Sequence, residues 1–418
     1  MSIVQFCHRV IFALIVFVLC YSVVAYGTTQ EWTQGPVIIA VLLAVFFWAI
    51  RLALVNGAEM VLSPLSLPML FTGSYLIIRY ALSDVEPVSR SSMLMPVTAV
   101  IFFFVVLNEI RHRWQVTTVV WLITGLGALL ALYGLFQSTI GARWVLGKAQ
   151  FAQYFGHASG TFFRPANLAM FLKIAFAIAA ANFILSHRPK IEKIGFAFIC
   201  LITGCGLFLT LSPEYWIGWI AMFCVLVFFA VRTRTWRFRW VIAGLSILAV
   251  VGSTIVMSKY KPSGDSNTEG TSLQAELDNL VLAQSPLAKN ETPVLSPRSL
   301  REAALAVGHP NIWIGSGGGM FPWLFPLWRT NHGIVQGVVE HCPNQYLDVF
   351  ASYGLMGVGL MLWIGIHLVL ALVQIIRLRD TKYGTNRPSN RYALVAAGLA
   401  IMAAVIVDAW IDLRLHTG

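Results

Sequence analysis

The sequence predicts an all-α polytopic membrane protein, a bundle of about 11–12 transmembrane helices. Hydrophobic residues make up 58% of the 418 residues and charged residues only 11%, too few to cover a water-soluble surface. Roughly eleven apolar stretches are long enough to cross about 30 Å of hydrocarbon as helices. Open strands are excluded, because every backbone amide in lipid needs an internal partner.

The apolar stretches divide the chain into three parts. We expect an N-terminal transmembrane bundle over residues 1–258 with about nine spans, a large loop over 259–345, and C-terminal transmembrane helices over 346–418. Two prolines, Pro64 and Pro68, predict a kink or break in the third span. The predicted spans are residues 10–26, 36–55, 61–82, 93–110, 115–136, 166–186, 194–211, 213–231, 240–258, 355–376 and 392–411.

Basic residues occur in alternate connections between the spans, which explains the net charge of +11 without a nucleic-acid partner. The intervening connections "GTTQEWTQG" and "LSPEYW" contain no Lys or Arg. This positive-inside pattern predicts a cytoplasmic N-terminus, with the C-terminus and the large loop outside. We interpret Arg51, near the inner end of its span, as a snorkelling anchor.

A short helix is expected in the large loop, because Ser296 and Pro297 favour a helix start and Gly308 favours its end. Arg298 and Arg301 share one face of its first turn. Two guanidiniums beside the positive end of a helix dipole suit a pyrophosphate. The alternative is a solvated helix in which Arg298 pairs with Glu302.

The end of the loop carries groups suited to acid–base chemistry. Glu340 or His341 can take a proton from a sugar hydroxyl as a general base, or His341 is simply a polar residue at a helix start. Asn344 suits the cap of the helix that follows. Upstream, the glycines of "IGSGGGMF" either bring backbone amides to a phosphate or form a tight turn.

Two charged residues lie inside predicted spans, where an unpaired charge is costly. We predict that Arg79, with Asp84 and Glu86 nearby, and Lys173, snorkelling toward Arg164, line an outward-facing cavity. The six cysteines form no metal-binding pattern.

Four motifs, in this order along the chain, carry a resemblance to a known family. They are "SGTFFRPANLAMFL", "HPNIWIGSGGGMFPWLFPLW", the spacing of Asn344, Gly354 and Gly357, and "VDAWIDLRLH" with Asp412. Over residues 155–418 the chain resembles the O-antigen ligase and O-antigen polymerase superfamily.

The resemblance implies a GT-C-like bundle in the bacterial inner membrane with a large periplasmic loop. Family members transfer a glycan from undecaprenyl pyrophosphate to a sugar hydroxyl, on lipid A core or another glycan, with inversion and without a metal or other cofactor. Such transfer serves lipopolysaccharide or exopolysaccharide assembly. The family's pyrophosphate-binding arginine corresponds to Arg298, with Arg301 as the alternative.

Two positions depart from the family pattern. Pro343 stands where the family's His precedes the Asn, although His341 matches the first His of its His-x-His-Asn form. Glu214 stands where a phosphate-binding Arg is expected, so Arg143, Arg164 or Lys148 would have to compensate. A relative that binds or scaffolds lipid-linked glycans therefore stays open. A secondary transporter is less favoured, because the sequence has no internal repeat.

Overall fold

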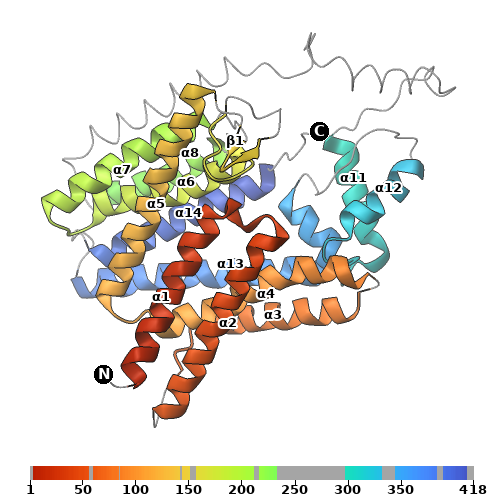
Figure 1. Ribbon diagram of the computed structural model, residues 1–418, viewed down its shortest axis with the longest axis horizontal. Helices are drawn as coiled ribbons and strands as arrows, with labels where there is room; N and C mark the ends of the chain where they lie inside the picture. The colour runs from red at the N-terminus through yellow and green to blue at the C-terminus, as the bar shows by residue number, and fades with distance from the viewer. Residues whose placement is uncertain are drawn as a thin grey trace.

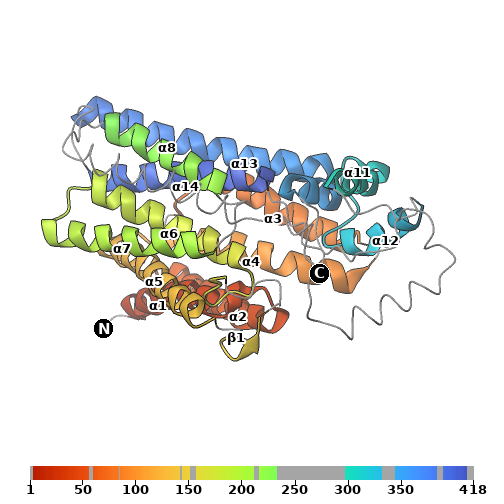
Figure 2. The same cartoon turned by 90° about the horizontal axis from the view of Figure 1, so that it is seen from above.

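Figure 1 shows the computed structural model, which describes residues 3–55, 60–83, 85–141, 144–150, 157–210, 216–232, 297–331, 344–383 and 389–411. The N-terminal end of α1 and the pair α11 and α12 lie at opposite ends of this part of the chain, in Figure 1 and in the perpendicular view of Figure 2.

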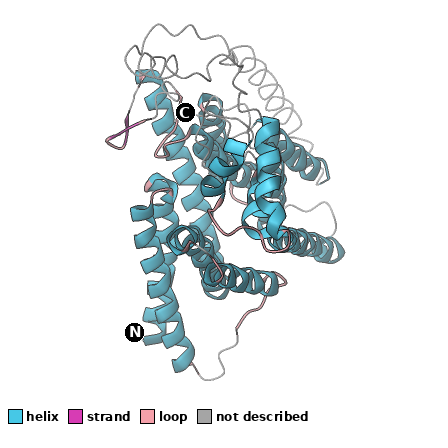
Figure 3. Cartoon of the chain, turned by 90° about the vertical axis from the view of Figure 1, so that its right-hand side faces the viewer, coloured by secondary structure: helices cyan, strands magenta, loops and turns pink. Residues whose placement is uncertain are grey.

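Helices form almost all of the described chain, and Figure 3 shows one small hairpin beside them. The first half comprises α1 (Ile3–Val24), the 3-10 turn η1 (Tyr26–Thr28), α2 (Glu31–Leu54), α3 (Ser66–Ala81), α4 (Glu86–Glu109), α5 (Arg113–Ile140), β1 (Trp144–Val145) and β2 (Lys148–Ala149). The second half comprises α6 (Pro165–Leu185), α7 (Lys190–Leu209), α8 (Trp216–Arg232), α11 (Pro297–Gly308), η5 (His309–Asn311), α12 (Phe321–Asn331), α13 (Gln345–Tyr383) and α14 (Asn390–Ile411).

The all-α polytopic membrane fold is confirmed. Eight of the described helices are long and apolar enough to cross a membrane, and the apolar helix α8 is shorter, at 17 residues. Every predicted span except 240–258, which lies outside the described residues, overlaps a described helix. The expected break at Pro64–Pro68 is wrong, because α3 begins at Ser66 and the preceding residues are not helical.

Contacts between connections agree with the predicted alternation of inner and outer connections along the chain. In two predicted outer connections, the Tyr26 hydroxyl donates to the Leu146 carbonyl at 3.1 Å. In two predicted inner connections, the His187 amide donates to Asn390 Oδ1 at 2.9 Å. The side of the membrane that each end faces remains a prediction.

The best-buried helix is α6, which packs against α5, α7, α8 and α14 in one core. Small residues make this packing possible, because they let helix backbones approach closely where lipid supplies no hydrophobic drive. A Cβ at Gly127 of α5 would lie 2.3 Å from the Cβ of Ala175 in α6. A second core joins α1, α2 and α4 around Ile11, Ile15 and Val105.

This packing makes Gly127→Ala destabilising. The added methyl overlaps Ala175, so α5 and α6 must separate, at a cost of about 1–3 kcal/mol. Gly125→Ala is the matched control, because a Cβ at Gly125 meets nothing within 4 Å. We expect a lower thermal unfolding midpoint in detergent for Gly127→Ala alone; equal midpoints for the two variants would contradict this packing.

Candidate functional site

The first segment of α13, residues 345–353, is the centre of the candidate site. Asn344 caps it: its Oδ1 accepts from the Tyr346 amide at 2.8 Å, and its carbonyl accepts from the Asp348 amide at 2.9 Å. The segment ends at Gly354, whose φ of 65° and ψ of −164° interrupt the helix. This φ lies in the region that glycine adopts without the strain of a side chain.

A glycine-rich loop, residues 312–320 between η5 and α12, is inserted at this break. It is called the glycine loop below. In an unbroken helix, the amides of Leu355 and Met356 would bond to the carbonyls of Ala351 and Ser352. Instead, these amides donate to the loop, Leu355 to the Ile312 carbonyl at 2.8 Å and Met356 to the Trp313 carbonyl at 3.1 Å. The freed carbonyls accept from the loop amides of Ser316 at 2.8 Å and Gly317 at 2.9 Å.

This exchange of hydrogen bonds brings the backbones of the glycine loop and α13 almost into contact. A Cβ at Gly354 would lie 2.5 Å from the Trp313 carbonyl group, and a Cβ at Gly315 would lie 2.5 Å from the backbone of residues 352–354. The amide of Gly315 donates to the Asn311 carbonyl at 2.6 Å. The amides of Gly315, Ser316 and Gly317 are therefore used within the chain and do not point to a phosphate.

Arg79 holds the other side of this loop. Its side chain is buried, at 5% exposure, and Nη2 donates to the Gly315 carbonyl at 3.0 Å. One turn earlier in α3, the Tyr75 hydroxyl donates to the Tyr353 carbonyl at 2.7 Å. Glu86, which we expected near Arg79, instead accepts from the Tyr80 hydroxyl at 2.9 Å. Arg79 therefore positions the loop.

Serines at the start of α4 complete the support, and the sequence reasoning missed them. Ser89 donates to the Gly318 carbonyl at 3.4 Å, and Ser92 is hydrogen-bonded to the Tyr353 hydroxyl. Two serines three positions apart at a helix start share one face, and this spacing could have indicated a shared polar contact. The glycine loop is thus enclosed by α3, α4 and α13.

The predicted arginine helix is present as α11, with the expected bounds of Pro297 and Gly308. Its buried face, Ala303, Ala304 and Val307, packs with Ala351 of α13 and two phenylalanines of α12. Arg301 is exposed. The backbone of Arg298 lies in the first turn, and its side chain lies outside the described residues.

Lys173 does not snorkel. It is buried in α6, at 2% exposure, and forms an ion pair with Asp408 of α14, a partner that the sequence reasoning missed. A Cβ at Gly218 would overlap the Asp408 carboxylate, so the glycine makes room for it. The adjoining cavity of about 10 Å³ is about large enough for one water molecule. This pair is therefore a closed internal contact and does not line an outward-facing cavity.

The ion pair lies close to the start of α13. The Tyr346 hydroxyl donates to the Ile406 carbonyl at 3.1 Å, two residues before Asp408. Asp408 lies in the last predicted span, 392–411, where a carboxylate needs a partner, so the sequence could have indicated it as the partner of Lys173.

Arg164 is the remaining predicted site residue that the structure describes. Arg164 is half-buried and directly precedes α6; its neighbour Phe163 stacks on Tyr26 with ring centroids 4.7 Å apart. Four further candidates, Glu340, His341, Arg143 and Asp412, lie outside the described residues. Within the described ranges, no group of three or more His, Cys, Asp or Glu side chains could hold a metal ion.

A known family model matches part of the chain. The model of the O-antigen ligase family, Wzy_C, matches residues 196–362, from α7 to the part of α13 beyond Gly354. The match includes α11, the glycine loop, Asn344 and the break in α13. No curated protein matches the chain.

Breaking the buried Lys173–Asp408 pair tests its structural role. Lys173→Met or Asp408→Asn leaves one buried charge without its partner and should cost about 3–5 kcal/mol of stability. The double variant should lose less than the sum of the two, with a coupling of about 1 kcal/mol or more, measured by thermal unfolding in detergent. Exposed Lys190→Met is the control. Strictly additive losses would show that the two side chains do not interact.

Proposed function

We propose that this multi-pass bacterial membrane protein is a glycosyltransferase of the inner membrane, because the O-antigen ligase family model matches residues 196–362. It transfers a glycan from undecaprenyl pyrophosphate to a sugar hydroxyl, either on lipid A core or on another glycan. The family match carries this proposal, and the structure supports the location of its site.

In the proposed reaction, the acceptor oxygen attacks the anomeric carbon of the donor glycan. The bond from that carbon to the pyrophosphate oxygen breaks, and undecaprenyl pyrophosphate leaves with the electron pair, inverting the anomeric carbon. His341 or Glu340 takes the acceptor proton. Arg298, or Arg301 in its place, stabilises the charge that develops on the pyrophosphate. No metal is needed for these steps.

The packing of α11 on α13 supports a shared site for these groups. Gly308, at the end of α11, lies so close to α13 that a Cβ there would be 2.7 Å from the Phe350 ring. Asn344 caps the start of α13, and the candidate bases Glu340 and His341 stand four and three positions before it in the chain. The first turn of α11 and the residues before Asn344 are therefore proposed to form one site beside this junction.

Arg143 and Arg164 are proposed to contribute positive charge from the side of α6. Asp412 follows α14 by one residue and is a further candidate from the resemblance. Periplasmic placement of this end follows from the basic-residue pattern.

A second candidate function is a protein that binds lipid-linked glycans without transferring them. Pro343 favours it, because a proline occupies the position next to Asn344 where the family has its His. This candidate predicts binding of the donor to the purified protein with no product.

The transfer reaction can be tested with the purified full-length protein, undecaprenyl-pyrophosphate glycan and candidate acceptors, followed by mass analysis of products. Arg298→Ala and His341→Ala should each lower the transfer rate by about 10²–10³-fold, because each removes a group that acts in the transition state. Arg90→Ala changes an exposed arginine of α4 and should not alter the rate. Membrane abundance should be unchanged in all three variants.

Near-normal transfer by both the Arg298 and His341 variants would refute the site assignment. Donor binding without product in the wild-type protein would instead support the binding candidate.

A further inference from the structure

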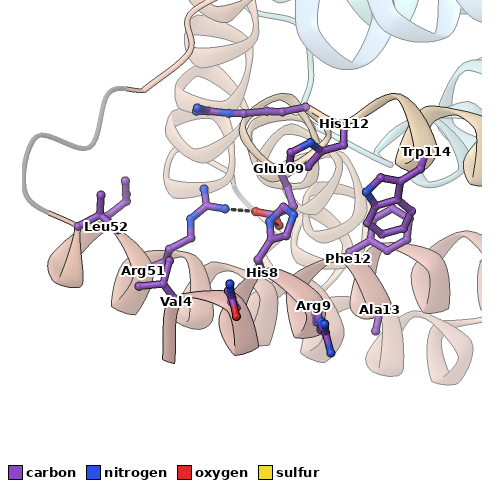
Figure 4. A pocket seen from close by; sticks show the side chains of 13 residues that line it. Val4, His8, Arg9, Phe12, Ala13, Arg51, Leu52, Glu109, His112 and Trp114 are labelled. Atoms are coloured by element: carbon purple, nitrogen blue, oxygen red, sulfur yellow. Dashed lines mark hydrogen bonds and ion pairs between the residues drawn. The ribbon is translucent and has the colours of Figure 1, made fainter. Parts of the chain in front are cut away.

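A pocket of about 840 Å³ lies where the N-terminal part of α1 meets the end of α2, the end of α4 and the start of α5. Its side chains are drawn in Figure 4. The pocket is at the predicted cytoplasmic ends of these helices, away from α11 and the glycine loop. It has no role in the proposed transfer.

A buried carboxylate forms the base of the pocket. Glu109, at 1% exposure, forms an ion pair with Arg51 of α2 and contacts Nδ1 of His8 of α1. Figure 4 shows both side chains turned toward it. Arg51 is therefore more than the snorkelling anchor that the sequence suggested, because it joins α2 to α4.

A buried amide fixes the neighbouring turn. Gln115 Oε1 accepts from the backbone amides of Arg111 at 3.1 Å and His112 at 2.9 Å. The Gln115 side chain also approaches His8, with 3.4 Å between the two Nε2 atoms. The turn that carries Arg111 and His112 into the pocket is thus held by hydrogen bonds from within the protein.

The lining has an excess of positive charge. Three arginines, Arg9, Arg51 and Arg111, and one carboxylate, Glu109, are among the lining residues, so the balance is +2 with both histidines neutral. Glu109 is already paired with Arg51 and in contact with His8. A guanidinium can bind two phosphate oxygens at once, so this balance suits a phosphate.

The remaining wall is apolar. Phe12 and Trp114 meet edge to face with ring centroids 4.9 Å apart, and Leu52 lies on the lining as well. Trp114 is largely exposed, as expected for a tryptophan at a membrane surface. An apolar wall beside a cationic base matches the acyl-glycerol part and the phosphate of a phospholipid. A soluble phosphate has no apolar part that could contact this wall.

We propose that this pocket binds the headgroup phosphate of an anionic phospholipid in the leaflet at the N-terminal end of α1, the cytoplasmic leaflet by the positive-inside pattern. The phosphate lies between Arg9 and Arg111, and the acyl-glycerol part lies along Phe12 and Trp114. The bound lipid ties together the ends of α1, α4 and α5.

The test is native mass spectrometry of the full-length protein in neutral detergent, titrated with phosphatidylglycerol or with phosphatidylcholine. Wild-type protein should retain phosphatidylglycerol in preference to phosphatidylcholine. Arg9→Ala and Arg111→Ala should each weaken that retention about fivefold. Arg113→Ala removes an exposed arginine from the same turn that does not line the pocket, and it should behave as wild type.

Equal retention of the two lipids, or equal losses in all three variants, would overturn the proposal. So would stabilisation of the wild-type protein by inorganic phosphate alone to the same degree as by phosphatidylglycerol, because the ligand would then be a soluble anion. Arg9→Ala changes an exposed side chain, which keeps the test valid if Arg111→Ala fails to fold.

Discussion

The exchange of backbone hydrogen bonds at Gly354 is the interaction on which the candidate site depends. Two helical bonds of α13 are given up, and four bonds to the glycine loop replace them. In or near hydrocarbon, each of these amides and carbonyls would cost several kcal/mol if left without a partner. The break therefore persists only while the loop is in place, and the loop is held only while the helix is broken.

This exchange fixes several other parts of the structure. The loop runs directly from η5, which follows α11, so α11 is placed over the first segment of α13. Arg79 binds the carbonyl side of the loop, and Ser89 and Ser92 support it from α4. Asn344 caps the start of the same segment.

Helices and their ends were largely predictable, because apolar length and caps are local properties of the sequence. The bounds of α11 followed from Pro297 and Gly308, and Asn344 was predicted as a cap for the reason observed. The start of α3 was misjudged, because prolines near positions 64–68 fit a helix start as well as a kink. The break at Gly354 was not predicted, since a single glycine in an apolar run does not reveal which loop will occupy the gap.

Charged partners from distant helices were the least predictable feature. Lys173 and Asp408 are 235 positions apart, and Arg51 and Glu109 are 58 positions apart. Their pairing depends on which helices are neighbours, and hydropathy does not contain that information. The cost of an unpaired charge in a membrane predicted that partners exist, but it did not identify them.

The most direct test of this account is hydrogen-exchange mass spectrometry on the full-length protein in lipid nanodiscs. The amides of Ser316, Gly317, Leu355 and Met356 should be protected to a similar degree in wild-type protein, because all four are bonded across the break. Gly354→Ala should remove that protection, while Gly359→Ala, where a Cβ meets nothing within 4 Å, should leave it intact. Rapid exchange of Ser316 and Gly317 in wild-type protein, beside a protected α13, would contradict the account.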